Sequence, residues 1–410
     1  MKVLMDPHVP LVGHQDHGRE LILKRLDEVR DALVELSHRI HEKPELGYEE
    51  FSARDWQVDF LREQGFDVEA PYCWLETSFR ASIKTGDAEG PRLAFLAEYD
   101  ALPGVGHACG HNIIAASAVG AGVGLAHAMK QAGVAGEVIV LGTPGEEGKG
   151  GKIHLVEHGA FDTIDFAMMV HPSNQNLIGR AGLAAQGLTV QYRGKAVHSA
   201  VPEKGINALS SLIALFNSID MLRQIWPDTG RCNGIITEGG KASNIIPDFA
   251  EARFTVRAGK KKELLAMMEG IRSAAKSAAQ LTGATVELLE APLFAERYSN
   301  STMGELFKAN IEALGEPVDY PDPQARVGSS DIGNVSMVVP SIHEYLAIAG
   351  AEVAGHTDAF REAARSPRGD EVVLLAAKGL AMTGWDLATN ADKRAEAQKE
   401  FMERALPNRC

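Results

Sequence analysis

Three short apolar runs, separated by segments of helical pattern, constrain the fold of this chain more than any other feature. They are RLAFLA (92–97), EVIVLG (137–142) and DFAMMV (165–170). Strands that are apolar at nearly every position are buried on both faces, as in a parallel sheet that helices cover on both sides. Chemistry in such sheets gathers beyond the carboxyl ends of the strands. The polar segments that follow these runs are therefore the first candidate sites.

The apolar pattern changes at about residue 186. LTVQYRG (188–194) and FAEARFTVRA (249–258) alternate apolar and polar residues, as half-buried strands do. With a strand around 235–236, a further strand ATVELLE (284–290) and helical segments between them, the order is β-α-β-β-α-β. This is the order of a ferredoxin-like sandwich.

A chain of 410 residues is longer than one hydrophobic core usually serves, so two domains are expected. We predict an α/β fold in which residues 1–185 and 296–410 form a larger domain around a mixed, mostly parallel sheet. A ferredoxin-like α+β domain, residues 186–295, is inserted into it. In the larger domain we also expect an amphipathic helix at 19–43 and a strand at 335–342.

Composition bears on the partners and the compartment. The formal net charge is −14, which argues against nucleic acid and against an anionic membrane surface as partners. The N-terminal segment lacks the continuous apolar core of a signal peptide, and the most apolar stretch, 113–129, is expected to be a buried helix. Four widely separated cysteines form no disulfide-like framework. We therefore expect a cytoplasmic protein.

The densest group of candidate metal ligands is HACGH (107–111). In extended backbone, residues two apart point to the same side, so Cys109 and His111 would reach one metal ion. Thiolate and imidazole are ligands that zinc and its neighbours favour. The alternative is a buried cysteine beside two ordinary histidines.

A pair of acids, Glu146 and Glu147, follows the run at 137–142 within TPGEEG. One of two adjacent carboxylates can hold a metal ion while the other takes a proton from the attacking water as general base. Pairs of glutamates are common on protein surfaces. The glycines Gly145 and Gly148, however, favour a tight turn over an exposed helix face.

Three further residues gain meaning beside these motifs. His171 ends the run at 165–170, and His356 lies in the polar segment AGHTDAF. Asp100, in YDALP, is placed to fix the tautomer of a metal-binding histidine. Each has a plainer interpretation, as a structural or exposed histidine and as an aspartate in a turn.

Taken in order, these motifs resemble those of the zinc-dependent aminoacylase and glutamate carboxypeptidase family. The matching segments are DALP, HACGH, GEE, the strand-ending His171, GKAVHSAVP (194–202) and ASNIIPD (242–248), with RIHEKPELGYEE (39–50) and GHTDAFREAA (355–364) toward the two ends. The most similar branch contains aminobenzoyl-glutamate hydrolases, β-alanyl-lysine-type dipeptidases, and hippurate and auxin-conjugate hydrolases. The resemblance covers nearly the whole chain.

The resemblance implies a catalytic larger domain and an inserted lid domain through which the chain forms a homodimer. It implies a divalent metal site of one or two ions, with zinc or manganese favoured and cobalt or nickel as further candidates. The ligands would be Cys109, His111, Glu147, His171 and His356. Glu146 would be the general base, and Asp100 would support the site.

Further residues are assigned to the substrate. By resemblance, His198 reaches the active site of the partner chain and helps to bind the substrate carbonyl oxygen as negative charge develops. Asn244 matches a family asparagine near the substrate. Arg257 is a candidate partner for a substrate carboxylate. Arg180 and His343 lie in segments near the expected pocket and are candidates for reading the substrate.

The chain departs from the family pattern at two positions. Asn112 stands where many relatives have Asp, and Asn233 stands where relatives usually carry His. The change at Asn233 puts the usual contacts with the substrate in doubt.

The sequence therefore predicts a metal-dependent hydrolase that cleaves a C–N bond, an amide, in a small acidic substrate. N-acyl or aminobenzoyl amino acids and dipeptides are such substrates. Hydrolytic deamination of a small aromatic acid at the same metal site is the alternative. A non-catalytic metal-binding protein would lack the base or a ligand, and this chain has all of them.

Overall fold

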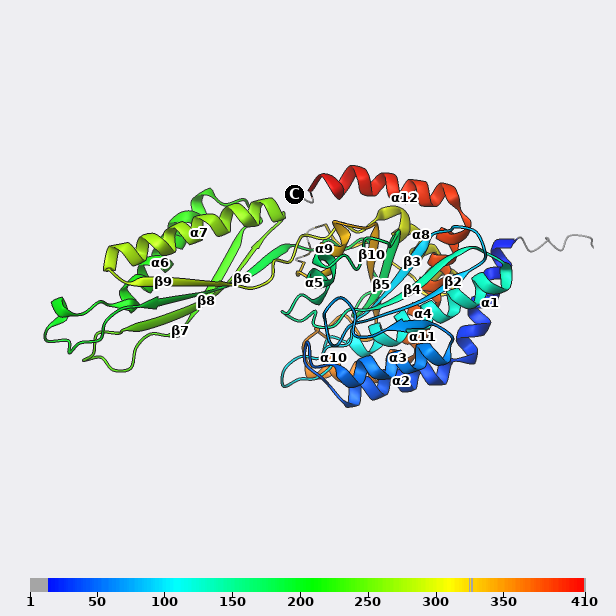
Figure 1. Ribbon diagram of the computed structural model, residues 1–410, viewed down its shortest axis with the longest axis horizontal. Coiled ribbons are helices and arrows are strands. Elements are labelled where there is room, and N and C mark those ends of the chain that lie inside the picture. Colours follow the sequence, from blue (N-terminus) through cyan, green and yellow to red (C-terminus); the bar gives the residue numbers. More distant parts are fainter. Residues whose placement is uncertain (1–13, 324, 326, 409–410) are drawn as a thin grey trace, which may run out of the picture.

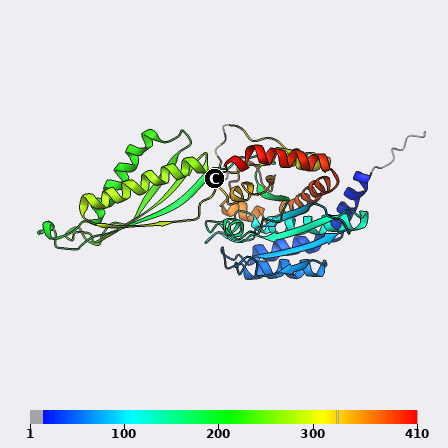
Figure 2. The same cartoon turned by 45° about the horizontal axis from the view of Figure 1, so that its top comes forward.

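The computed structural model describes residues 14–323, 325 and 327–408, which form two bodies (Figure 1). The larger body contains a six-stranded sheet, and the smaller body, formed by the middle of the chain, contains a four-stranded sheet. The smaller body extends away from the larger one, so the molecule is elongated (Figure 2). The predictions for the segment up to residue 13 and for the thiol of Cys410 lie outside the described residues.

The six-stranded sheet is mixed and mostly parallel, which confirms the predicted fold class. Its order is β1 (Asp67–Glu69), β2 (Phe79–Thr85), β4 (Gly136–Gly142), β3 (Arg92–Ala97), β5 (Phe166–Ser173) and β10 (Ser341–Ala347). Strands β3, β4, β5 and β10 run parallel, and the pairs β1–β2 and β2–β4 are antiparallel. The carboxyl ends of the four parallel strands consequently meet at one edge of the sheet.

Helices cover both faces of this sheet. Leu93 and Phe95 of β3 belong to one hydrophobic core, whereas Ala94 and Leu96 belong to the core on the opposite face, which is why the run is continuously apolar. The first core is covered by α1 (His14–Glu28), α2 (Arg30–Glu42), α3 (Phe51–Glu63), α4 (His111–Ala132), α8 (Ser301–Ala313) and α11 (Pro367–Thr389). The second is covered by α5 (Gly151–Glu157) and α9 (Ile332–Ser336).

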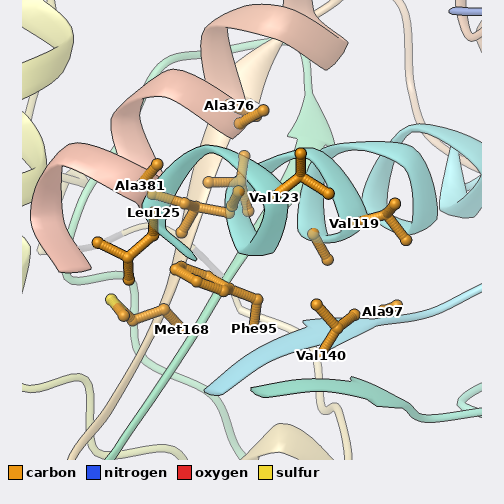
Figure 3. Close-up of a cluster of buried hydrophobic side chains, with 14 of the residues drawn as sticks. Phe95, Ala97, Val119, Val123, Leu125, Val140, Met168, Ala376 and Ala381 are labelled. Atoms are coloured by element: carbon orange, nitrogen blue, oxygen red, sulfur yellow. The ribbon is translucent and has the colours of Figure 1, made fainter. Parts of the chain in front are cut away.

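Helix α4 occupies the centre of the first core (Figure 3). It lies between the sheet, which contributes Phe95 and Val140, and α11, which contributes Ala376 and Ala381. A Cβ atom on Gly122 would lie 2.4 Å from a methyl carbon of Val140, so the glycine permits the close approach of helix to sheet. By length and composition, α4 and α11 are each apolar enough to span a membrane, but 94% and 83% of their most apolar windows are buried inside the fold.

The smaller body has the β-α-β-β-α-β order that the sequence predicts. It contains β6 (Ala184–Arg193), α6 (Ala208–Leu222), β7 (Arg231–Glu238), β8 (Phe249–Ala258), α7 (Lys261–Thr282) and β9 (Thr285–Glu290). The sheet order is β7-β8-β6-β9 with antiparallel neighbours, and α6 and α7 pack on one face of the sheet around a separate hydrophobic core. We call this body the lid.

Predictions for individual elements of the larger domain were wrong in two places. The segment 19–43 forms two helices, because Val29, with φ −102° and ψ 7°, departs from helical geometry between them. The strand expected at 335–342 begins only at Ser341, after Pro340, and α9 occupies part of the run instead. The helix α9 and the strand that begins at Ser341 are both buried and apolar. In so short a run, periodicity does not distinguish a buried helix from a buried strand.

Several further helices connect or extend these elements. They are α10 (Asp358–Ala363), α12 (Ala391–Arg404), and the short 3-10 helices Pro202–Lys204, Arg223–Ile225 and Leu406–Asn408. The α12 helix is attached to the larger domain by the side chain of Asn300, which donates to the carbonyl of Ala397 at 2.8 Å.

Candidate metal centre

The site lies at the edge of the sheet where the parallel strands end. Asp100 follows β3, Glu146 and Glu147 follow β4, and His171 lies near the end of β5. These segments come from distant parts of the sequence. The parallel topology brings them to the same edge, as expected for a sheet of this kind.

Six side chains form three overlapping groups of candidate ligands. Within each group, the ligand atoms all lie within 4.8 Å of one another. The groups are Cys109, His111 and His171; Cys109, Glu147 and His356; and His111, Glu146 and Glu147. The five residues that the resemblance assigned as ligands, and the predicted base, are thus together in one cluster.

Individual distances define this cluster further. The Sγ atom of Cys109 lies 3.4 Å from Nε2 of His171, and Nε2 of His356 lies 3.4 Å from Oε1 of Glu147. Nδ1 of His171 donates to the carbonyl of Pro172 at 2.6 Å, which leaves the lone pair of the ring on Nε2, facing the cluster.

The premise that HACGH is extended was wrong. Residues around His107 form turns, Gly110 has a φ of 78°, and His111 is the first residue of α4. A Cβ atom at position 110 would lie 2.9 Å from Pro172, so both the backbone angle and the space require glycine. Cys109 and His111 reach the same cluster through this turn, whereas His107 is buried and stacks on the ring of His41.

Unpartnered buried atoms show that these residues fit a divalent metal. Nε2 of His111 and Oε1 of Glu147 are buried and have no hydrogen-bond partner among the described residues. Buried polar groups are normally paired, so these atoms are suited to a ligand that supplies positive charge. A soft thiol, imidazoles and carboxylates in one cluster are the donor set of zinc and of first-row transition metals.

The electrostatics agree with this interpretation. Burial, followed by the neighbouring Glu98 and Asp331, raises the pKa of Glu146 well above its usual value. Burial also raises the pKa of the Cys109 thiol to about 12. Burial alone would lower the pKa of His111, but the nearby Cys109 and Asp100 raise it well above its usual value. A divalent cation would stabilise the ionised forms of the acids and the thiol, and on binding it would displace the proton from Nε2 of His111.

Asp100 is placed as predicted for a supporting residue, because one of its oxygens lies beside His111 and the other accepts the backbone N–H of Glu147. Burial acts to raise its pKa, but His111 and the backbone N–H groups of Glu147 and Glu146 hold it at about 2. Asp100 is therefore ionised in this site.

Sequence reasoning missed a buried charge network beneath the cluster. The ammonium group of Lys152 contacts carboxylate oxygens of Glu98 and Asp331, the latter at 2.8 Å, and all three side chains are almost completely buried. The second oxygen of Glu98 lies 3.5 Å from Nε2 of His111. The sequence feature that could have indicated this network is Glu98, an acid directly after the apolar run 92–97.

A cavity of about 450 Å3 opens beside the cluster. Its lining includes the predicted residues Arg180 and His343 and two residues that were not predicted, Arg297 and Tyr345. Arg297 and Tyr345 belong to none of the sequence motifs. They lie in segments that are distant from Arg180 in the sequence.

The four lid residues assigned to the substrate do not line this cavity within a single chain. They are His198, Asn233, Asn244 and Arg257. His198 and Asn244 are exposed and lie in neighbouring loops, because the N–H of Ser199 donates to the carbonyl of Asn244 at 2.9 Å. Asn233 is exposed on β7, and Arg257 lies on β8. Their roles stay predictions.

Known proteins show the same architecture and related sequences. The M20 peptidase dimerisation domain model matches residues 178–282, which contain most of the lid. An Xaa-Arg dipeptidase of Mus musculus is 39% identical over 392 residues, covering 92% of this chain and 90% of that protein. A p-aminobenzoyl-glutamate hydrolase chain of Escherichia coli (strain K12) is 27% identical over 308 residues, covering 70% of this chain and 63% of that protein.

A solved structure agrees with these sequence matches. It is a Bacillus subtilis protein described as a dinuclear metal-binding peptidase of the M20 family, and it superposes with a TM-score of 0.65 at 22% identity. The match covers 88% of this chain and 99% of that chain. The chain belongs to the M20 family of metallopeptidases and amidohydrolases, and it is a hydrolase of C–N bonds.

Proposed function

We propose that this enzyme hydrolyses the amide bond of a small acidic substrate, such as an N-acyl or aminobenzoyl amino acid or a dipeptide, with two divalent ions in the cluster. The overlapping ligand groups carry this proposal. Cys109, His111 and Glu147 each belong to two of the three groups. Together the groups offer more donors than one four-coordinate ion takes.

Zinc and manganese are the ions we propose. The thiolate of Cys109 and the imidazole groups suit zinc, and the carboxylates also suit manganese. The described cysteines Cys73, Cys109 and Cys232 are free thiols, which supports our proposal of a cytoplasmic enzyme.

The chain's own residues have distinct tasks in this reaction. When bound, a divalent ion supplies polarisation of the scissile carbonyl and a lower pKa for a water molecule. Glu146 takes the proton of the attacking water and returns it to the leaving nitrogen, as a general base and then a general acid. Asp100 holds His111 with its Nε2 lone pair toward the cluster. Lys152 offsets the charge of Glu98 and Asp331 below.

We further propose that the active site is completed by a second copy of the chain. The region that matches a dimerisation domain contains most of the lid, and the outer strand β7 of the lid exposes Ile235 and Ile236 by 65% and 47%. His198, which does not line the cavity of its own chain, would then reach the cavity of the partner and bind the carbonyl oxygen.

Complementation tests this arrangement. His198→Ala and Glu146→Ala are each expected to be inactive as homodimers. Co-expressed, they form mixed dimers in which one site has both residues intact, so part of the activity returns. If the mixture stays inactive while mass spectrometry shows mixed dimers, His198 does not act across the interface.

The reaction itself is tested by turnover with product identification. The purified enzyme is stripped with a chelator, reloaded with zinc or manganese, and given aminobenzoyl-glutamate, N-acyl amino acids, basic dipeptides and aminobenzoic acids. We expect an amine and a carboxylic acid from an amide, lost on chelation and restored by metal. Release of ammonia from an intact aromatic acid would show that the enzyme catalyses deamination instead of amide hydrolysis. The absence of turnover in every metal form would overturn the proposal.

A further inference from the structure

Two arginines share one aromatic ring in the wall of the cavity. The guanidinium carbon of Arg180 lies 5.1 Å from the centre of the Tyr345 ring, and that of Arg297 lies 5.5 Å from it. Among the described residues, neither guanidinium forms an ion pair with a carboxylate. Two like charges near one ring repel each other, so this wall is suited to an anion.

Arg297 is held in place by the protein. Its Nε donates to the carbonyl of Arg180 and its Nη2 to the carbonyl of Ala181, both at 2.9 Å. Its Nη1 donates to Nδ1 of His343 at 2.7 Å and to the hydroxyl oxygen of Tyr345 at 3.0 Å. Arg297 therefore supplies positive charge and orients its neighbours, whereas the guanidinium of Arg180 has no hydrogen bond or ion pair with the described residues and can bind a ligand.

The bond from Arg297 sets the tautomer of His343. Because Nδ1 accepts a hydrogen bond, the ring proton of His343 is on Nε2. This Nε2 atom is buried and has no hydrogen-bond partner in the part of the chain that the structure describes, and His343 is only 2% exposed. The hydroxyl oxygen of Tyr345 accepts a hydrogen bond from Arg297, so the hydroxyl hydrogen can donate to another group. The wall thus presents one guanidinium and two neutral donors.

Glu344, which lies between His343 and Tyr345 in the sequence, does not neutralise this wall. Both carboxylate oxygens of Glu344 are occupied, one by the N–H of Gly179 at 2.8 Å and the other by the hydroxyl of Ser299 at 3.1 Å. A buried donor without a partner is unfavourable, so the free donors of His343 and Tyr345 favour a ligand with acceptor oxygens.

The wall is adjacent to the metal centre. The ring of His171, a candidate ligand, lies 5.3 Å from the ring of His343 and 5.7 Å from that of Tyr345. His171 and Tyr345 are direct neighbours across the parallel pair β5–β10. A molecule small enough for the cavity can therefore contact the cluster and Arg180 at once.

Building on the proposed amide hydrolysis, we propose that Arg180, His343 and Tyr345 form a binding subsite for a carboxylate of the substrate. Arg180 supplies the charge, and the donors of His343 and Tyr345 orient the oxygens, with Arg297 as the positioning residue. A substrate that placed a guanidinium or ammonium group here would add a third cation to this wall. The subsite therefore takes a carboxylate of the substrate and disfavours a cationic group in the same place.

The test uses a charged substrate and its neutral counterpart. N-benzoylglycine carries the carboxylate, and N-benzoylglycinamide has the same scissile amide without it. The variant is Arg180→Gln, because Arg297 also anchors the backbone of Arg180 and Ala181. The matched control is Arg193→Gln, an exposed arginine of the lid whose guanidinium lies 5.0 Å from the Phe249 ring.

We expect Arg180→Gln to lower kcat/KM for N-benzoylglycine by about 10- to 100-fold, mainly through KM. Its kcat/KM for benzoate release from N-benzoylglycinamide stays within about twofold of wild type. The substitution removes hydrogen bonds to a carboxylate, and this substrate has no carboxylate. Arg193→Gln behaves as wild type on both substrates. Equal losses on acid and amide would overturn the subsite and leave amide hydrolysis intact.

A binding measurement separates this proposal from the proposed reaction. Metal-loaded Glu146→Ala retains the cavity, and calorimetry is used to compare its affinity for N-benzoylglycine with that of Glu146→Ala/Arg180→Gln. Weaker binding by the double variant supports the subsite even if wild type hydrolyses neither compound, which would overturn only the reaction. Equal binding by the two, or no binding by either, overturns the subsite.

Discussion

The carboxylate of Asp100 lies 3.2 Å from Nδ1 of His111, and both side chains are fully buried. The Nδ1–H donates to this carboxylate, which leaves the lone pair on Nε2 for a metal ion. The other oxygen of Asp100 accepts the N–H of Glu147 at 2.9 Å. A single buried acid thus fixes one candidate ligand at the start of α4 and another in the turn after β4.

Asp100→Asn is expected to weaken metal binding by about 10- to 100-fold, because one amide oxygen cannot accept both hydrogen bonds. Competition with a chromophoric chelator measures the affinity. The control is Asp165→Asn, an acid paired with Arg92 at the amino ends of the same strands, which leaves metal affinity unchanged. Unaltered affinity in Asp100→Asn would show that the backbone alone positions these ligands.

Glu146→Gln is expected to lower kcat by about 10²- to 10⁴-fold, because an amide cannot take a proton from the attacking water. Metal content, measured by atomic emission, stays at the wild-type value. Glu157→Gln, at an exposed position of α5, keeps full activity. A loss of metal in proportion to activity would instead identify Glu146 as a ligand.

Lys152→Met is expected to lower the free energy of unfolding by about 3–5 kcal/mol, because it leaves the buried acids Glu98 and Asp331 without their cation. Denaturant unfolding followed by tryptophan fluorescence measures the loss. Lys393→Met breaks a surface pair with Glu396 and changes stability by at most about 1 kcal/mol. Similar losses in the two variants would show that the buried network adds nothing.

Glu344 gives a pH dependence of stability whose sign is fixed. Burial raises its pKa to about 7, although the N–H of Gly179 and the charge of Arg297 act against this. Between its unfolded pKa near 4.5 and about 7, the folded chain binds more protons at this residue than the unfolded chain. Its contribution therefore favours folding at low pH and declines as pH rises, by at most about 1.4 kcal/mol per pH unit.

The variant Glu344→Gln removes this titration. Its unfolding free energy, relative to wild type, is expected to increase between pH 4.5 and pH 7 and to be constant above that. Denaturant titrations at a series of pH values measure the difference. A difference that does not vary with pH would show that Glu344 is ionised in the folded protein throughout the range.

The strands and the candidate ligands were accessible from the sequence for local reasons. Central strands buried on both faces leave continuous apolar runs, and the candidate residues Asp100, Glu146 and Glu147 come shortly after two of these runs. The lid order was readable because half-buried strands alternate. Each of these signals is contained within about ten residues.

What the sequence did not reveal depends on contacts between distant segments. Arg297 meets Tyr345 only because β10 pairs with β5 and the chain returns from the lid beside them. Lys152 lies within a short helix, and nothing in its neighbours indicates that it reaches Glu98. The turn at HACGH, where extended backbone was expected, depends on the contact of Gly110 with Pro172, which lies far along the chain.

The lid interrupts the larger domain between β5 and β10, and this has a consequence for how the enzyme is made. A ribosome releases His171 first, then the whole of the lid, and only later Arg297, His343 and His356. Domains fold as units as they emerge, so the lid can be complete while the last strand of the catalytic sheet is still being translated. Because His356 is one of the candidate ligands, the complete candidate site, and turnover that depends on it, can form only near the end of synthesis.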